Sequence, residues 1–183
     1  MARSSFEIQK LNLPGVLLIQ PKRWEDERGF FMETFHKEAL MAAGITDEFV
    51  QDNLSYSKKN VLRGLHYQKA PHAQVKLIRC VSGKIFDVVA DYDPASATFG
   101  TYVSTILSGD TQAILYVPKQ YVHGACVLSD EAILEYKVDD YYYPECVAGV
   151  RYDDPAFNIT WPVENPILSE QDKSWQLLPK RRS

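Results

Sequence analysis

Residues 51–68 read Gln51-Asp-Asn-Leu-Ser-Tyr-Ser-Lys-Lys-Asn-Val-Leu-Arg-Gly-Leu-His-Tyr-Gln68 and are rich in residues that favour β-strands. Two predicted strands, residues 49–57 and 61–67, stand here on either side of a short polar break. The second strand contains a cation, Arg63, three residues before an imidazole, His66. The stretch therefore predicts β-structure that carries two side chains suited to chemistry.

The same pattern of short strand-forming runs between turn signals extends over most of the chain. Many short strands with hardly any helix predict an all-β sandwich or barrel. The predicted strands are Val16–Gln20, Phe30–Phe35, Phe49–Ser57, Val61–Tyr67, Val75–Val81, Lys84–Asp91, Tyr102–Leu107, Ile114–Val117, Val122–Leu128 and Ala132–Val138.

Local signals add detail to this pattern. Ser82-Gly83 stands between two predicted strands and predicts a tight hairpin turn. The run Lys84–Asp91 is mostly apolar at successive positions, which predicts a strand covered on both faces. One helix is predicted from Lys37 to Ala43, closed by Gly44 in the left-handed conformation.

The chain has 183 residues, a length that suits one domain with a sizeable core, so we expect a single domain over residues 1–183. Frequent prolines in residues 139–183 predict a C-terminal segment that wraps the sheets with turns and short helices. Residues 1–5 are expected to form a loose arm. No apolar run approaches the roughly 20 residues that span a bilayer, so we expect a cytoplasmic protein without membrane contact.

Charge and cysteine content narrow the classes of function. The net charge of −4 argues against a general nucleic-acid-binding protein. An anionic small substrate would need a local basic pocket, which Arg28, Arg63 and Lys76 can build. The three cysteines lack a Cys-x-x-Cys spacing and the four histidines lack a His-x-His pattern, so we expect neither a metal site nor another cofactor.

The spacing of Arg63 and His66 poses a geometric question. Histidine is the side chain best suited to proton transfer near neutral pH, and arginine suits an anionic group such as phosphate. Residues an odd number apart on a strand point to opposite faces, so these two should not share a site. Either Gly64 marks a bulge that turns one of them, or Arg63 reaches the site around a strand end.

Several segments along the chain together resemble the dTDP-4-dehydrorhamnose 3,5-epimerase family, which acts on nucleotide-linked 4-keto sugars. Besides residues 51–68, they are Asp26–Glu33, Gln74–Leu77, Gly83–Val88, Val117–Gly124, Leu134–Lys137, Tyr152–Pro155, Trp161-Pro162 and Leu168–Asp172. The resemblance implies a cupin-type jelly-roll sandwich with short peripheral helices. It also implies an isomerase that converts dTDP-4-dehydro-6-deoxyglucose to dTDP-4-dehydrorhamnose without a cofactor.

The reaction implied by the resemblance is proton transfer at carbon. Both C3 and C5 lie next to the keto group, so each can lose a proton to form an enolate and regain it on the other face. His66 is the expected base, oriented by Asp172, and Tyr136 is the expected acid. Lys76 is expected to stabilise the enolate oxygen.

Further residues match positions that the family uses to hold its substrate. They are Arg28, Glu33, Gln51, Asn53, Arg63, Lys76 and His123, with Phe30 and Tyr141 expected to stack on the nucleobase. We also expect a homodimer in which residues near Arg28 and Glu33 enter the neighbour's pocket.

Two departures from the family pattern keep alternatives open. Gln171 and Val147 stand where the family typically has lysine and glutamate. The alternatives are an epimerase that acts at C3 or C5 only, an epimerase of another nucleotide keto-sugar such as a GDP-linked heptose, and a 3,4-ketoisomerase. A nucleotide-sugar-binding cupin without catalysis is the non-enzymatic alternative, which the joint presence of His66, Tyr136 and Asp172 disfavours.

Overall fold

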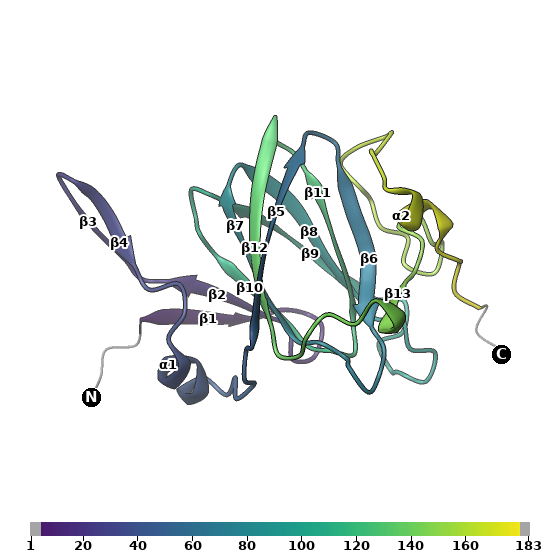
Figure 1. The fold of residues 1–183 in the computed structure, drawn as a ribbon, viewed down its shortest axis with the longest axis horizontal. Coiled ribbons are helices and arrows are strands. Elements are labelled where there is room, and N and C mark those ends of the chain that lie inside the picture. The colour runs from purple at the N-terminus through teal and green to yellow at the C-terminus, as the bar shows by residue number, and fades with distance from the viewer. Residues whose placement is uncertain (1–4, 180–183) are drawn as a thin grey trace.

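The computed structural model describes residues 5–179, and its main body is a sandwich of two antiparallel sheets (Figure 1). The six-stranded sheet has the order β1 (Phe6–Lys10), β2 (Leu17–Pro21), β10 (Ile114–Val117), β7 (Lys76–Ser82), β12 (Glu131–Val138) and β5 (Gln51–Lys58). The five-stranded sheet has the order β13 (Val147–Gly149), β6 (Leu62–Gln68), β11 (Val122–Val127), β8 (Lys84–Ala90) and β9 (Tyr102–Ser108). The prediction of an all-β sandwich is confirmed.

Each of the ten predicted runs contains a strand, with ends that differ by a few residues. Three strands were not predicted: β1, β3 (Arg23–Asp26) and β13. β1 and β3 are mostly exposed and carry charged side chains, and β13 has only three residues, so none shows a strong apolar alternation. Of the predicted N-terminal arm, residues 1–4 lie outside the described part of the chain.

The helix prediction is confirmed within one residue, because α1 spans Lys37–Ala42 and Gly44 follows with φ +89°. The hairpin prediction at Ser82-Gly83 is wrong. The turn joins β7 to β8, which belong to different sheets and do not pair. Gly83 is required there because a Cβ would come within 2.1 Å of the Glu131 carbonyl oxygen. A sequence signal for a tight turn thus says nothing about whether its strands pair.

Apolar side chains also pack on the outer face of each sheet. Strand β8 is buried on both sides, as predicted, with Val88 and Ala90 in a cluster on its outer face. Residues 150–178 supply Val150, Phe157 and Leu178 to that cluster. On the other sheet, side chains of α1 cover β2, β7 and β10. That the chain forms a single domain stays a prediction.

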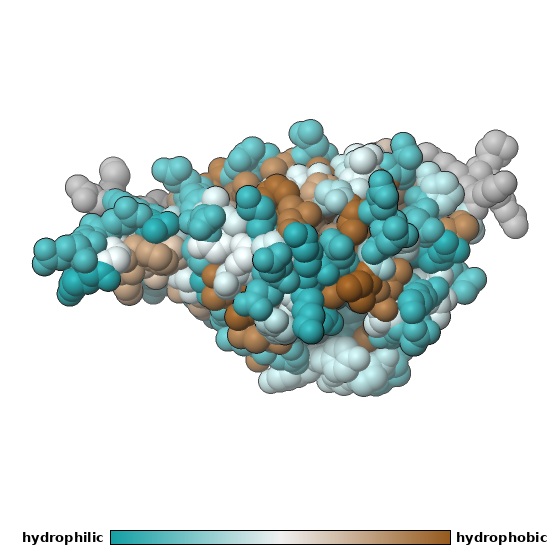
Figure 2. Space-filling view, turned by 90° about the horizontal axis from the view of Figure 1, so that it is seen from above, coloured by the Kyte–Doolittle hydropathy of each residue, from teal (hydrophilic) through white to brown (hydrophobic). Residues whose placement is uncertain are grey.

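One part of the chain does not pack on the sandwich. β3 and β4 (Gly29–Met32) form a two-stranded ribbon that projects from the main body (Figure 1). Seen from above it is an arm with pale brown side chains between teal ones (Figure 2). Its aromatic side chains Trp24, Phe30 and Phe31 are exposed by 41%, 50% and 66%, which is unusual for such residues.

The second described helix, α2, spans Glu170–Ser174 and lies beside β6. Within residues 5–179, no helix has both the length and the apolar character needed to span a membrane.

Candidate active site

A cavity of about 220 Å³ lies between the two sheets. Both sheets contribute polar and apolar side chains to its wall. Its lining consists of Ser55, Ser57, Val61, Arg63, His66, Lys76, Ile78, Ile85, His123, Ala125, Val127, Leu134 and Tyr136. Five of the residues predicted from the sequence are therefore brought to one enclosed space.

A bulge in β6 places Arg63 and His66 in the same cavity. The register between β6 and β11 shifts between these two residues, where β6 has one residue more than its partner. Gly64 has φ +131°, and a Cβ there would come within 2.5 Å of the Gly124 Cα. Of the two alternatives left by the sequence, the bulge is the one that the structure shows.

His66 and Asp172 form a hydrogen-bonded pair at the wall of the cavity. Asp172 lies on α2, is only 3% exposed, and contacts His66 through the imidazole Nε2. Ser169 Oγ donates to the other carboxylate oxygen at 2.8 Å and also caps the helix. Burial raises the pKa of Asp172, but the hydrogen bond and charge of His66 and the hydrogen bond from Ser169 outweigh burial and hold this pKa below its usual value. Asp172 is therefore a carboxylate beside the ring.

An ionised Asp172 fixes the tautomer of His66. The carboxylate accepts the proton of Nε2, which leaves the lone pair of a neutral ring on Nδ1. Nδ1 has no hydrogen-bond partner within the described residues. The ring of Trp175 lies edge-on to His66, with the ring centroids 6.2 Å apart, and limits its movement. His66 is thus held in a form that can accept a proton.

Tyr136 lines the cavity from β12, in the sheet opposite to that of His66. Burial raises the pKa of its phenol, while the positive charge of Arg63 acts in the opposite direction. The net pKa lies above the usual value, so the phenol keeps its proton at neutral pH and can donate it. The cavity therefore has a proton acceptor on one wall and a proton donor on the other.

Lys76 lies on the same wall as Tyr136, and burial lowers its pKa to about 8 against the opposing negative charge of Asp87. Asp87 is fully buried and accepts hydrogen bonds from His123 Nε2 at 2.8 and 3.0 Å. Asp87 was missed as a site residue. The signal was present, because an acid stands at an inward position of an otherwise apolar strand.

The guanidinium of Arg63 is held by β5. Its Nε donates to Ser57 Oγ at 2.9 Å, and a terminal nitrogen donates to the Tyr56 carbonyl at 3.3 Å. Nothing in the sequence marks Ser57, because only the pairing of the sheets brings it to Arg63. The cation is thereby fixed in the cavity, where it can bind an anion.

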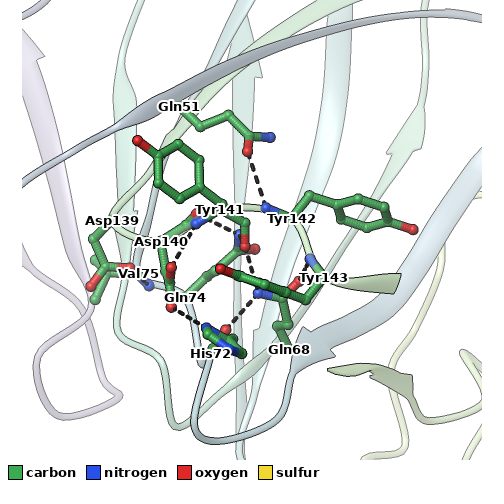
Figure 3. A network of polar contacts seen from close by, with 10 residues as sticks. All are labelled: Gln51, Gln68, His72, Gln74, Val75, Asp139, Asp140, Tyr141, Tyr142 and Tyr143. Atoms are coloured by element: carbon green, nitrogen blue, oxygen red, sulfur yellow. Dashed lines mark hydrogen bonds and ion pairs between the residues drawn. The ribbon is translucent and has the colours of Figure 1, made fainter. Parts of the chain in front are cut away.

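Asn53 and Gln51 are the next two residues beyond Ser55 on the same face of β5. Gln51 Nε2 donates to Asn53 Oδ1 at 2.8 Å. Its Oε1 accepts from the backbone N–H of Tyr142, in the segment that also contains Tyr141 (Figure 3). These residues do not line the cavity but gather beside it.

Arg28, Phe30 and Glu33 are not brought to the cavity of their own chain. Arg28 lies at the tip of the projecting ribbon, where its side chain is 85% exposed and pairs with Asp26. Within residues 5–179, no three or more His, Cys, Asp or Glu side chains are grouped as metal ligands would be.

Comparisons with known proteins agree with this geometry. A family model described as dTDP-4-dehydrorhamnose 3,5-epimerase matches residues 10–180. A relative of that name from Shigella flexneri is 48% identical over 168 residues, which cover 91% of this chain and 93% of the relative.

Two solved structures share the fold. The enzyme from Bacillus anthracis, with TDP and PPi bound, has a TM-score of 0.92 and 42% identity, and the match covers 94% of this chain and 99% of that one. The enzyme from Legionella pneumophila, in complex with dTDP-4-keto-L-rhamnose, has a TM-score of 0.89 and 43% identity over 94% of this chain and 93% of that one. The prediction of a cupin-type jelly roll is confirmed.

Proposed function

The chain belongs to the dTDP-4-dehydrorhamnose 3,5-epimerase family, and from that premise we propose how its own residues carry the reaction. It is an isomerase that epimerises a dTDP-linked 4-keto sugar at C3 and C5. In our proposal, His66 removes the proton from one face of each carbon and Tyr136 returns a proton to the other face.

The observation that carries this assignment is the placement of the two groups on opposite walls of one cavity. His66 Nδ1 takes the proton, and the electron pair of the C–H bond moves toward the keto oxygen to form an enolate. Lys76 is the nearby cation that stabilises this oxygen. The Tyr136 hydroxyl then protonates the carbon, and a proton passes from imidazolium to phenolate through solvent, which restores both groups.

Anion binding completes the proposal. Arg63 and His123 are fixed by Ser57 and Asp87, and they offer positive charge or donors to the diphosphate and sugar. Gln51 and Asn53 lie beside the cavity, where amides can bond a nucleotide. The site needs no metal or nicotinamide for proton transfer.

Deuterium exchange tests the proposed function. Incubation of dTDP-4-dehydro-6-deoxyglucose with the protein in D2O should place solvent deuterium at both C3 and C5 of the product, as read by NMR. Uptake at one carbon only would identify a single-centre epimerase. No uptake at either carbon, in a folded protein that binds dTDP, would favour the non-enzymatic alternative.

We also propose that the working unit is a homodimer completed by the ribbon. Arg28 and Phe30 project into solvent, away from the cavity of their own chain, on an arm with exposed aromatic side chains. In a two-fold dimer such an arm can cover the partner's sheet edge and reach its cavity. Arg28 would then add a cation for the diphosphate, and Phe30 a face for the base.

A further inference from the structure

Residues 139–143, Asp-Asp-Tyr-Tyr-Tyr, lead from β12 in the six-stranded sheet toward β13 in the five-stranded sheet. We call them the rim segment, because they cross from one sheet to the other beside the cavity. Tyr142 is close enough to Tyr136 to contribute to the raised pKa of that phenol. The rings of Tyr141 and Tyr142 are nevertheless 57% and 58% exposed.

One buried glutamine ties the backbone of the rim segment to the loop after β6 (Figure 3). Gln68 is only 3% exposed. Its Nε2 donates to the carbonyls of His72 and Tyr141 at 2.5 and 3.0 Å, and its Oε1 accepts from the Tyr143 N–H at 2.9 Å. All three bonds go to backbone groups, so they fix the path of the chain and do not involve the rings of Tyr141 and Tyr142.

A histidine holds the other side of the segment. His72 Nδ1 lies 2.9 Å from Asp140 Oδ2, and the imidazole stacks on the Tyr143 ring with centroids 3.6 Å apart and planes 18° from parallel. The bond from His72 lowers the pKa of Asp140, so this carboxylate is ionised at neutral pH. Its other oxygen accepts from the Tyr141 N–H at 2.7 Å.

Further bonds leave little freedom in the segment. Gln74 Nε2 donates to the carbonyls of Asp140 and Tyr141 at 2.8 and 3.1 Å. The Val75 N–H donates to Asp139 Oδ1 at 2.6 Å. Two glutamine side chains thus bond the backbone of the rim segment, while the rings of Tyr141 and Tyr142 stay in solvent.

We propose that Gln68, Gln74 and His72 with Asp140 are positioning residues that hold the rim tyrosines ready to bind the nucleotide base. The inference rests on the proposed function and deepens it. Aromatic faces stack on a nucleobase, and a segment that is already ordered loses less entropy when it binds. The network is therefore expected to contribute to nucleotide affinity and not to proton transfer, which the proposed function assigns to His66 and Tyr136.

Two substitutions of His72 separate its two contacts. His72→Phe keeps an aromatic ring over Tyr143 but removes the bond to Asp140, and His72→Asn keeps a donor near the position of Nδ1 but removes the ring. Lys59→Gln is the control, because it breaks an exposed ion pair with Asp130, which precedes β12 and so lies at the end of that strand opposite to the rim segment. Affinity for dTDP is measured by calorimetry, with KM, kcat and melting temperature for each folded variant.

We expect His72→Phe to weaken dTDP binding and raise KM by about three- to tenfold, with kcat within about twofold of wild type. His72→Asn should be intermediate, and Lys59→Gln should bind as wild type does. Asp140→Asn should add little to His72→Phe, because both remove the same bond.

A folded His72→Phe protein that binds dTDP with unchanged affinity would overturn the inference, even if its melting temperature falls. So would a fall in kcat at constant KM. A wild-type protein that fails to bind dTDP would instead contradict the proposed function, so the two failures are distinguishable.

Discussion

Two of the four histidines, His66 and His123, line the cavity and bond a buried carboxylate through Nε2, and His66 is the one that the family pattern matches to the base. His36 caps a helix, while His72 and His123 each pair with an acid that holds a neighbouring segment or side chain. The free Nδ1 of His66 is the feature that a base requires.

Removal of this base should stop exchange at both carbons. His66→Asn is expected to lower deuterium uptake by about 10²- to 10⁴-fold while dTDP affinity changes little, because the ring is assigned to proton transfer. Tyr136→Phe should impair return of the proton more than its removal, so exchange without inversion should persist. More than a few per cent of wild-type exchange in His66→Asn would remove it from the base role, and full inversion by Tyr136→Phe would do the same for Tyr136.

The depressed pKa of Lys76 predicts an alkaline limb in the pH profile. Burial lowers this pKa to about 8, so the ammonium loses its proton as the pH rises through that value and the enolate oxygen loses its cation. The profile of kcat/KM should therefore fall above about pH 8. Tyr136 titrates later because its pKa is raised. In Lys76→Arg, whose guanidinium stays charged, the fall in kcat/KM near pH 8 should disappear. If the fall remains near pH 8 in this variant, a group other than Lys76 causes it.

At the scale of the element, the bulge in β6 decides whether the site exists. Gly64→Ala is expected to lower the free energy of unfolding by about 2–4 kcal/mol. Alanine is strained at the φ of this position, and its Cβ would clash with the backbone of β11. Gly29→Ala is the matched control: its φ is +121° and no atom lies within 4 Å of the added Cβ. Urea denaturation should show a clearly smaller loss of unfolding free energy for Gly29→Ala than for Gly64→Ala. Equal losses would mean that contact with β11 is not the cause.

Helix α2 shows how a short element without stability of its own can place a carboxylate in the candidate site. Five residues are too few for an isolated helix, so α2 depends on its Ser169 cap and on packing beside β6. That dependence places Asp172 against a strand more than a hundred residues earlier in the chain.

At the scale of the whole molecule, complementation tests the proposed dimer. Arg28→Ala and His66→Asn proteins should each be nearly inactive. In a heterodimer, one site combines an intact His66 with the partner's Arg28, so statistical exchange of an equal mixture should restore about a quarter of all sites. No recovery despite exchange proven by mass spectrometry, or full activity of a monomer, would show that each chain builds its site alone.

Chelation tests the expectation that no metal takes part. Activity should survive exhaustive treatment with EDTA, because proton transfer in the proposed site uses only protein side chains. Loss of activity that one particular divalent ion restores would contradict this.

The sequence by itself determined the strands and their approximate ends, because apolar and β-branched residues recur locally with turn residues between them. Local patterns could not tell that Ser82-Gly83 joins two sheets, since pairing is decided by strands distant in the chain. The family resemblance predicted His66, Asp172, Arg63 and His123 as site residues, but it did not mark Ser57 and Asp87, which bond Arg63 and His123 in the fold.

How these residues lie relative to one another depends on contacts between strands that are distant in the chain. The register shift at Gly64 turns Arg63 and His66 to one face, against the alternation of an ordinary strand. The buried contacts of Asp172 and Lys76 set their pKa values, because desolvation and neighbouring charge depend on residues that meet only in the fold. The sequence shows which side chains can exchange protons, but only the packing of the two sheets places them on opposite walls of one cavity.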